Sequence, residues 1–256
     1  MAVFIAVVSH GHGELINQLK CLEKLAKDYT VIVKSNMEGD DFQELNESTS
    51  FHWINHMYGL GFGKNNNVIY GYCKKELSMS NDDYFVVLNP DVIVSSAHLC
   101  SLVSHMNGKN RELATINLFK DKELTVFDPS IRRFPTLVNF ILSFLGAGNK
   151  SIMDKATIKE CKEVDWAAGS FLCFSSSHYE KLEGFNESYF MYCEDIDICY
   201  RSHLMGVPVT YYPNIKAIHL AKHANRKFLS KHFYWHVSSV IRFLINKNIR
   251  FPFKYN

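Results

Sequence analysis

The chain has 256 residues, of which 47% are hydrophobic and 21% are charged. This is an ordinary globular composition, and the length suits one large domain or two small ones with a real core. No apolar run reaches the roughly 18–20 residues that a membrane span needs, and residues 1–14 lack the basic region of a signal peptide. The seven cysteines are scattered without a CxxC pair, which argues for a reducing compartment and against a disulfide scaffold or zinc ribbon. A secreted or membrane-spanning protein is therefore not expected.

The net charge of +2 is unevenly distributed along the chain. The 59 residues after Asp197 contain ten Lys and Arg and no Asp or Glu, so this tail carries +10 and the first 197 residues carry −8. The tail is also rich in aromatic residues. Such a segment is typical of one that meets an anionic partner, which could be a nucleic acid, a phosphorylated ligand or a lipid surface.

The first half of the chain alternates between predicted strands and helices. Apolar, β-branched runs predict strands, and apolar residues at helical spacing predict helices. We expect strands at 3–8, 29–33, 51–54 and 84–88, and helices at 15–25, 65–77 and 99–106. This alternation predicts an α/β fold with a Rossmann-like, mostly parallel sheet and helices on both faces.

The second half has a less regular pattern. We expect strands at 113–119, 124–127, 164–174 (broken at Gly169) and 207–212, and helices at 134–145, 195–205 and 228–245. The last of these has an amphipathic pattern, and no repeat or flexible linker precedes it. We predict a domain at 1–225 and a basic, amphipathic C-terminal extension at 226–256 that belongs to the same structural unit.

Ligands of open α/β sheets bind beyond the carboxyl ends of the strands, which directs attention to four segments. These are residues 10–12, 59–67, 89–91 and the strand end before His219. The three glycines at 59, 61 and 63 do not have dinucleotide-fingerprint spacing, but they expose backbone N–H groups to an anion at a helix start. A plain loop is the alternative.

Asp91 and His219 each follow a predicted strand. A carboxylate at Asp91 suits a hard divalent cation that keeps open positions for substrate phosphates, although Asn-Pro-Asp is also good turn chemistry. His219 could supply a nitrogen ligand, but in a chain with twelve histidines a lone one is usually structural.

The densest polar cluster contains Glu194, Asp195 and Asp197 at the predicted start of a helix. The helix dipole favours carboxylates there, so a purely structural role is the alternative. Asp195 and Asp197 point roughly 200° apart around a helix, and Arg201 lies four residues after Asp197, where the two can pair. We interpret Asp197 and Arg201 as structural, and Glu194 and Asp195 as available for chemistry.

In their order and spacing, these motifs resemble those of the inverting glycosyltransferases of family 2, which have the GT-A fold. The chain looks most like the bacterial rhamnosyltransferases that build O-antigen and related surface polysaccharides. The resemblance rests on residues 8–12, 61–67, 88–91, 132–135, 165–171, 189–197 and 217–219.

The resemblance assigns roles to residues of this chain. Asp195 matches the general base, with Glu194 beside it to orient the base or the acceptor. Asp91 and His219 match the residues that hold Mg²⁺ or Mn²⁺ on the donor diphosphate. The residues that match donor-binding positions are Ser9, His10, Gly61, Phe62, Asn66, Asn67, Asn89 and Arg132. The residues that match acceptor-binding positions are Asp165, Trp166 and Gly169.

One base and no covalent nucleophile imply a single displacement with inversion. The chain departs from relatives after the second strand, where Val33-Lys34-Ser35-Asn36 stands in place of the usual Asp-Asn that contacts the nucleoside, so the nucleotide is left open. The metal motif begins with Asn89 instead of Asp, as it does in rhamnosyltransferase relatives. There is no Gln-x-x-Arg-Trp motif, and we therefore expect one sugar to be added per acceptor.

We expect transfer of L-rhamnose from dTDP-rhamnose to an undecaprenyl-diphosphate-linked sugar. We also expect a cytoplasmic protein, peripheral on the inner face of the cytoplasmic membrane, with its tail on anionic lipid. A core helix whose charges only face water is the alternative for the tail. A different donor such as UDP-galactofuranose remains open. A nucleic-acid-binding protein is disfavoured by the acidic first 197 residues, and a nucleotidyltransferase by the sparse acidic motif at 89–91.

Overall fold

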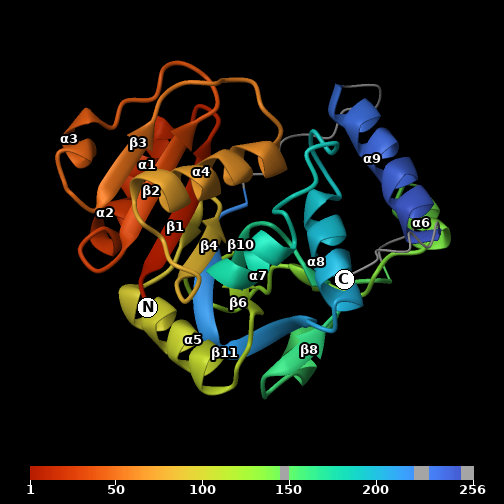
Figure 1. Cartoon of the computed structure of the whole chain (residues 1–256). Coiled ribbons are helices and arrows are strands. Elements are labelled where there is room, and N and C mark those ends of the chain that lie inside the picture. The colour runs from red at the N-terminus through yellow and green to blue at the C-terminus, as the bar shows by residue number, and fades with distance from the viewer. Residues whose placement is uncertain (145–149, 222–230, 249–256) are drawn as a thin grey trace.

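The computed structural model describes residues 1–144, 150–221 and 231–248 (Figure 1). Its centre is a nine-stranded sheet with the order β3-β2-β1-β4-β10-β6-β11-β5, and β8 pairs with β11. The strands are β1 (Val3–Ser9), β2 (Thr30–Ser35), β3 (Phe51–Ile54), β4 (Tyr84–Leu88), β5 (Val92–Ile93), β6 (Leu113–Phe119), β8 (Lys162–Val164), β10 (Phe171–Ser175) and β11 (Val209–His219). Only β5, β8 and β10 run against the others, so the prediction of a mostly parallel α/β sheet is confirmed.

Helices cover both faces of the sheet. They are α1 (Gly13–Leu19), α2 (Cys21–Leu25), α3 (Gln43–Asn46), α4 (Phe62–Glu76), α5 (Ser96–Gly108), α6 (Leu137–Phe144), α7 (Ser176–Lys181), α8 (Glu194–Leu204) and α9 (Lys231–Asn248), with a 3₁₀ turn at Lys155–Thr157. A small second sheet pairs β7 (Ile131–Arg132) with β9 (Trp166–Ala167). In Figure 1, α9 lies beside α8 at the edge of the molecule.

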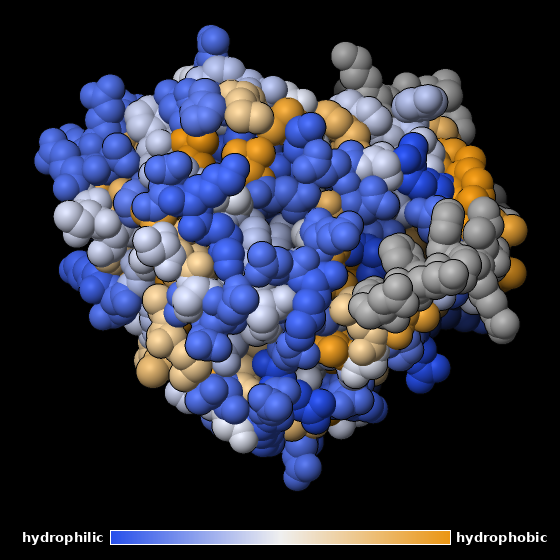
Figure 2. Space-filling model, in the orientation of Figure 1, coloured by the Kyte–Doolittle hydropathy of each residue, from blue (hydrophilic) through white to orange (hydrophobic). Residues whose placement is uncertain are grey.

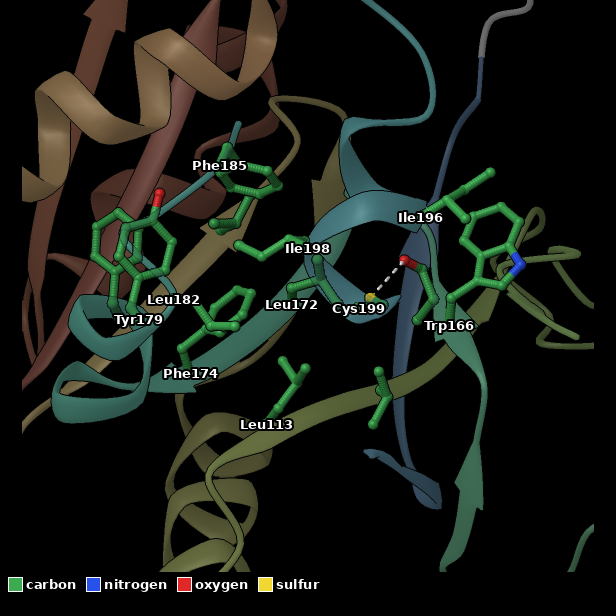
Figure 3. Close-up of a cluster of buried hydrophobic side chains, with 14 of the residues drawn as sticks. Leu113, Trp166, Leu172, Phe174, Tyr179, Leu182, Phe185, Ile196, Ile198 and Cys199 are labelled. Atoms are coloured by element: carbon green, nitrogen blue, oxygen red, sulfur yellow. Dashed lines mark hydrogen bonds between the residues drawn. The ribbon is translucent and has the colours of Figure 1, made fainter. Parts of the chain in front are cut away.

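Two buried clusters form the core, one on each face of the sheet. Side chains alternate along β1, so that Phe4 and Ala6 enter one cluster with α4 and α8, while Ile5 and Val7 enter the other with α1 and α5. Figure 3 shows the first cluster, where Ile198 and Cys199 of α8 meet Leu172 and Phe174 of β10. The core therefore fixes the position of α8 against the sheet.

Three expected elements differ in the structure. The helix expected at 15–25 is two helices, because Lys20 between them has a left-handed backbone (φ 51°). The prediction of a strand at 124–127 is wrong. Leu124 also has a left-handed backbone (φ 56°), and it lies in a turn where the Asp121 carboxylate accepts hydrogen bonds from the N–H groups of Thr125 and Val126. The long strand expected at 164–174 is three short strands that belong to different pairings.

The C-terminal part agrees with the prediction in outline. The strand expected at 207–212 runs on to His219, with an irregularity between Tyr212 and Lys216. The helix expected at 228–245 is present as α9, although residues 228–230 and the proposed domain boundary at 225 lie outside the described residues. Within the described part of the chain, no helix combines the length and hydrophobicity that a bilayer crossing requires.

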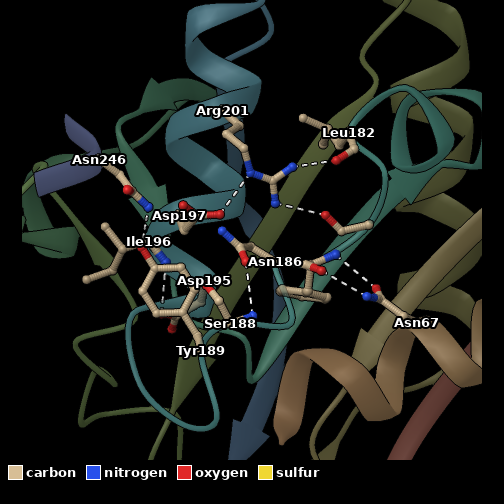
Figure 4. A network of polar contacts seen from close by, with 12 residues as sticks. Asn67, Leu182, Asn186, Ser188, Tyr189, Asp195, Ile196, Asp197, Arg201 and Asn246 are labelled. Atoms are coloured by element: carbon tan, nitrogen blue, oxygen red, sulfur yellow. Dashed lines mark hydrogen bonds and ion pairs between the residues drawn. The ribbon is translucent and has the colours of Figure 1, made fainter. Parts of the chain in front are cut away.

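Ion pairing fixes the register of α8 against the loop before it. Arg201 donates from Nε to Oδ2 of the buried Asp197 at 2.8 Å, and its terminal nitrogens donate to the carbonyls of Leu182 and Gly184 (Figure 4). All three nitrogens of the guanidinium are thus engaged within the fold, which confirms that Asp197 and Arg201 pair. The two preceding carboxylates are left for another role.

Candidate active site

The first two residues of α8 present their carboxylates at a pocket of about 200 Å³. Glu194 is buried, and its Oε2 has no hydrogen-bond partner among the described residues. Asp195 is partly exposed. Other walls of the pocket come from Arg132, Trp166, Phe140 of α6 and His236 of α9.

Asp195 is held by backbone donors on two sides. Gly169 N–H donates to Oδ2 at 3.2 Å, and Ile196 N–H donates to Oδ1 at 2.9 Å. A Cβ at position 169 would lie 3.0 Å from the Phe62 ring and 3.7 Å from the Cβ of Asp195, so the close approach favours glycine there. The structure thus brings together the predicted base, a predicted acceptor residue and a predicted donor residue.

The two carboxyl groups both have raised pKa values, but their surroundings differ. Burial raises the pKa of Glu194 to about 8, and the neighbouring Asp195 charge adds to the rise. Burial also raises the pKa of Asp195, but the N–H groups of Gly169 and Ile196 and the Arg132 cation favour its charged form. We therefore assign the proton at neutral pH to Glu194 and the charge to Asp195, which suits a base beside a neutral partner.

A larger hollow of about 420 Å³ lies on α9, lined by Tyr234, Ile241, Arg242 and Ile245 among others. None of its lining residues is an acid or a histidine. General base chemistry needs a titratable group within reach of the substrate. The smaller pocket at α8, which holds Glu194 and Asp195, is therefore preferred to this hollow as the candidate active site.

Asp91 and His219 lie together at the strand ends. His219 Nε2 is 3.4 Å from Asp91 Oδ1, and His219 Nδ1 is 3.0 Å from Asp128 Oδ2. Burial opposes the charge on both groups. Even so, the bond to Asp128 and that to Asp91 raise the pKa of His219 to about 9, and His219 in turn lowers the pKa of Asp91.

These residues fit a divalent cation that is shared with a phosphate ligand. Among the described residues, no group of three or more His, Cys, Asp or Glu side chains is arranged to hold a metal by itself. A magnesium site that uses one or two protein ligands together with substrate phosphates and water needs no such group. Asp128 on the far nitrogen of His219 is the usual arrangement that orients a metal-binding imidazole.

The residues after β1 and β2 are tied to each other. The Ser9 hydroxyl accepts from His12 N–H at 3.0 Å, and the exposed His10 ring lies 3.5 Å from the Asn36 amide. The buried Lys34 donates to the Met57 carbonyl at 3.0 Å. Lys34 thus holds the loop before the glycine-rich turn.

The glycine-rich turn begins α4 and packs against the loop before α8. A Cβ at Gly61 would collide with the Phe190 carbonyl. Asn66 donates to the Phe62 carbonyl at 3.0 Å and leaves its buried Oδ1 without a partner in the described part of the chain. Asn67 instead bonds the Phe185 backbone (Figure 4) and the Tyr179 hydroxyl, so its own donor-binding role stays a prediction.

The remaining predicted residues surround the pocket or support it. Asp165 accepts from Phe134 N–H at 2.8 Å, and Trp166 donates to the Arg133 carbonyl at 2.9 Å. The Arg132 guanidinium lies 5.3 Å from the centre of the Trp166 ring. Asn89, at the end of β4, donates its N–H to the Ser170 carbonyl at 3.0 Å.

Three residues at these sites were not predicted from the sequence. Asp128 lies 91 residues before its partner His219, and only its position in an Asp-Pro pair directly after Phe127 sets it apart. Tyr192 and His236 line the pocket from segments 44 residues apart. The aromatic and histidine content of the tail was the available signal for His236.

Comparison with known proteins was made at the level of sequence and of fold. No protein-family model matches the chain. The chain is 39% identical over 252 residues to the rhamnosyltransferase WbbL of Escherichia coli K12. The aligned region covers 96% of this chain and 94% of that protein. It is 27% identical over 174 residues to an N-acetylglucosaminyl-diphospho-decaprenol L-rhamnosyltransferase of Mycobacterium tuberculosis, of which it spans 56%.

Solved structures of TarS from S. aureus have a similar fold. TarS 1-349 in complex with UDP matches with a TM-score of 0.57 at 12% identity, over 85% of this chain and 60% of that one. This likeness concerns the fold alone. It agrees with the GT-A architecture that the motifs predict.

Proposed function

Because this chain belongs to the family 2 glycosyltransferases of GT-A fold, the family of the rhamnosyltransferase WbbL, we propose that it transfers L-rhamnose from dTDP-rhamnose to a sugar carried on undecaprenyl diphosphate. The observation that carries the proposal is the near full-length identity to WbbL together with the carboxylate of Asp195 in the pocket at α8. The named donor and the lipid-linked acceptor are the parts of the proposal that an assay must decide.

The proposed reaction is a single displacement. Asp195 takes the proton of the acceptor hydroxyl while the acceptor oxygen forms a bond to the anomeric carbon. The bond from that carbon to the diphosphate oxygen breaks, and dTDP leaves with the electron pair. Glu194 keeps its proton at neutral pH and so adds no second negative charge beside the base.

The leaving diphosphate needs positive charge. Asp91 and His219 would hold Mg²⁺ or Mn²⁺, which when bound stabilises the departing phosphate as a Lewis acid. Asp128 orients the His219 ring. The Arg132 guanidinium, which lines the same pocket as Asp195, would add a fixed cation beside the donor, in keeping with its predicted donor-binding role.

Incubation of the purified protein with a panel of nucleotide sugars and a synthetic lipid-diphosphate acceptor tests the function. We expect product from dTDP-rhamnose, with the anomeric configuration inverted relative to the donor, and none from UDP-galactofuranose or UDP-N-acetylglucosamine. Transfer from only one of the UDP-sugars would replace the proposed donor. No transfer from any sugar, with the donor hydrolysed instead, would refute the transferase assignment.

We also propose that the protein works at the cytoplasmic face of the membrane, with α9 and α6 toward the lipid. Apolar side chains gather at this edge in Figure 2, and Tyr234, Ile241 and Ile245 of α9 are each at least half exposed. The absence of acidic residues after Asp197 suits an anionic surface. We expect sedimentation with anionic vesicles that weakens as salt is raised; sedimentation that is independent of lipid charge would refute an electrostatic contact.

A further inference from the structure

Residues 189–193, here called the pre-α8 loop, lead directly into the two carboxylates of the active site. Tyr192 and Cys193 both have left-handed backbone conformations, with φ of 71° and 64°. Neither residue is glycine, so each conformation has an energetic cost that the surrounding structure must offset. Because α8 begins at the next residue, the backbone at 192 and 193 sets the direction in which Glu194 and Asp195 point.

Helix α9 contacts the pre-α8 loop through four successive loop residues. The buried Ser239 donates from its hydroxyl to the Met191 carbonyl at 2.9 Å, and the Tyr192 hydroxyl lies 3.1 Å from His232 Nδ1. Further contacts pair the Phe190 ring with Trp235, with centroids 4.6 Å apart, and the Tyr189 hydroxyl with the Asn246 amide at 3.4 Å (Figure 4). One face of α9 thus contacts the pre-α8 loop along its length.

The opposite side of the loop rests on the glycine-rich turn. Phe62 N–H donates to the Phe190 carbonyl at 3.1 Å, and Gly61 allows the two backbones to approach. Phe62 also packs beside Gly169, which itself donates to Asp195. The loop therefore connects α9 to both the donor-side turn and the base.

We propose that α9 is the element that positions the catalytic base, acting on the pre-α8 loop through Ser239 and Tyr192. The inference rests on the proposed role of Asp195. If the hold on Met191 and Tyr192 is lost, the loop can relax toward ordinary backbone conformations and turn the start of α8 away from Gly169. A shift of about 1 Å in a reacting group can cost on the order of 10²-fold in rate, so small changes in α9 should be visible in kcat.

Adjacent serines of α9 give a matched pair of variants for the test. Ser239→Ala removes the bond to the loop, whereas Ser238→Ala removes a hydroxyl on the side that lines the outer hollow. With a short-chain, water-soluble acceptor, we expect Ser239→Ala to lower kcat about 3–10-fold, the effect of one net hydrogen bond. We expect KM for the donor to stay within about twofold and Ser238→Ala to match the wild type, and Ser239→Thr, which keeps the hydroxyl, should recover most of kcat.

Tyr192→Phe gives a second test that leaves Ser239 and its buried contacts intact. It removes only the hydroxyl that meets His232, and we expect a fall in kcat of similar size. Combining it with Ser239→Ala should lower kcat about 10–100-fold, because the two hydrogen bonds that are lost fix neighbouring residues of the loop. Ser238→Ala again serves as the control from the outer side of the same helix, and it should have no effect.

The outcomes separate this inference from the proposed function. Normal kcat in both Ser239→Ala and Tyr192→Phe, beside an inactive Asp195→Asn, overturns the role of α9 and leaves the transferase intact. An equal fall in the Ser238 and Ser239 variants, or a loss that appears only in KM, also overturns it. A wild-type protein that transfers no sugar refutes the proposed function itself.

Discussion

Replacement of Asp195 by Asn is expected to lower kcat by about 10²–10⁴-fold, because it keeps the shape of the side chain and removes its basicity. The carbonyl oxygen of the introduced amide could still accept one of the N–H groups of Gly169 and Ile196 that Asp195 accepts now. Folding and donor binding should therefore survive. Steady-state kinetics with the lipid-diphosphate acceptor, together with calorimetric titration of the donor nucleotide, would separate the loss of chemistry from any loss of binding.

Glu194→Gln is the matched control for that experiment. Glu194 is protonated at neutral pH by our assignment, so its replacement by a neutral amide should change kcat much less than the change at Asp195. Near-normal turnover in Asp195→Asn and a collapse in Glu194→Gln would exchange the two roles. The exchange would mean that the proton lies on Asp195 in the donor complex.

The parts of this site that lie close together in the sequence could be predicted, because short segments contain both the secondary-structure pattern and the chemically active residues. Apolar runs that end in polar residues identified β1 and β4 and the residues that follow them. Three acids in four residues, with Arg201 one turn after the last, predicted one ion pair and two carboxylates available for chemistry. Family resemblance then supplied the role of Asp195, which spacing alone left open.

The parts that were missed depend on distant contacts. Nothing near Asp128 in the sequence indicates that it contacts His219. The segment just before it was predicted as a strand, whereas it forms a turn that brings Asp128 to the histidine. The break at Lys20 is invisible to periodicity, because the leucines on both sides keep helical spacing. The C-terminal extension was predicted from its charge, yet His236 and Ser239 act through its inward face.

Removal of divalent cations is expected to abolish transfer, and Mg²⁺ or Mn²⁺ should restore it. The motivation is the pair of proposed ligand atoms, Asp91 Oδ1 and His219 Nε2, that lie 3.4 Å apart with Asp128 behind the imidazole. A loss of several kcal/mol of transition-state stabilisation takes turnover down by at least about 10³-fold. The measurement is the initial rate after EDTA treatment and dialysis, followed by metal titration.

A graded set of variants makes the metal prediction specific to this chain. His219→Ala removes a proposed ligand, so activity should stay low at any accessible Mg²⁺ concentration. Asp128→Asn leaves both ligands in place but weakens the hold on the imidazole, so it should raise the half-saturating Mg²⁺ concentration about 10–100-fold while saturating metal restores most of kcat. Full activity of the wild type in metal-free buffer would contradict the site, because the leaving diphosphate must then be stabilised by fixed cations. Arg132 and Arg133, whose segment pairs with β9 beside the active site, would become the residues to replace.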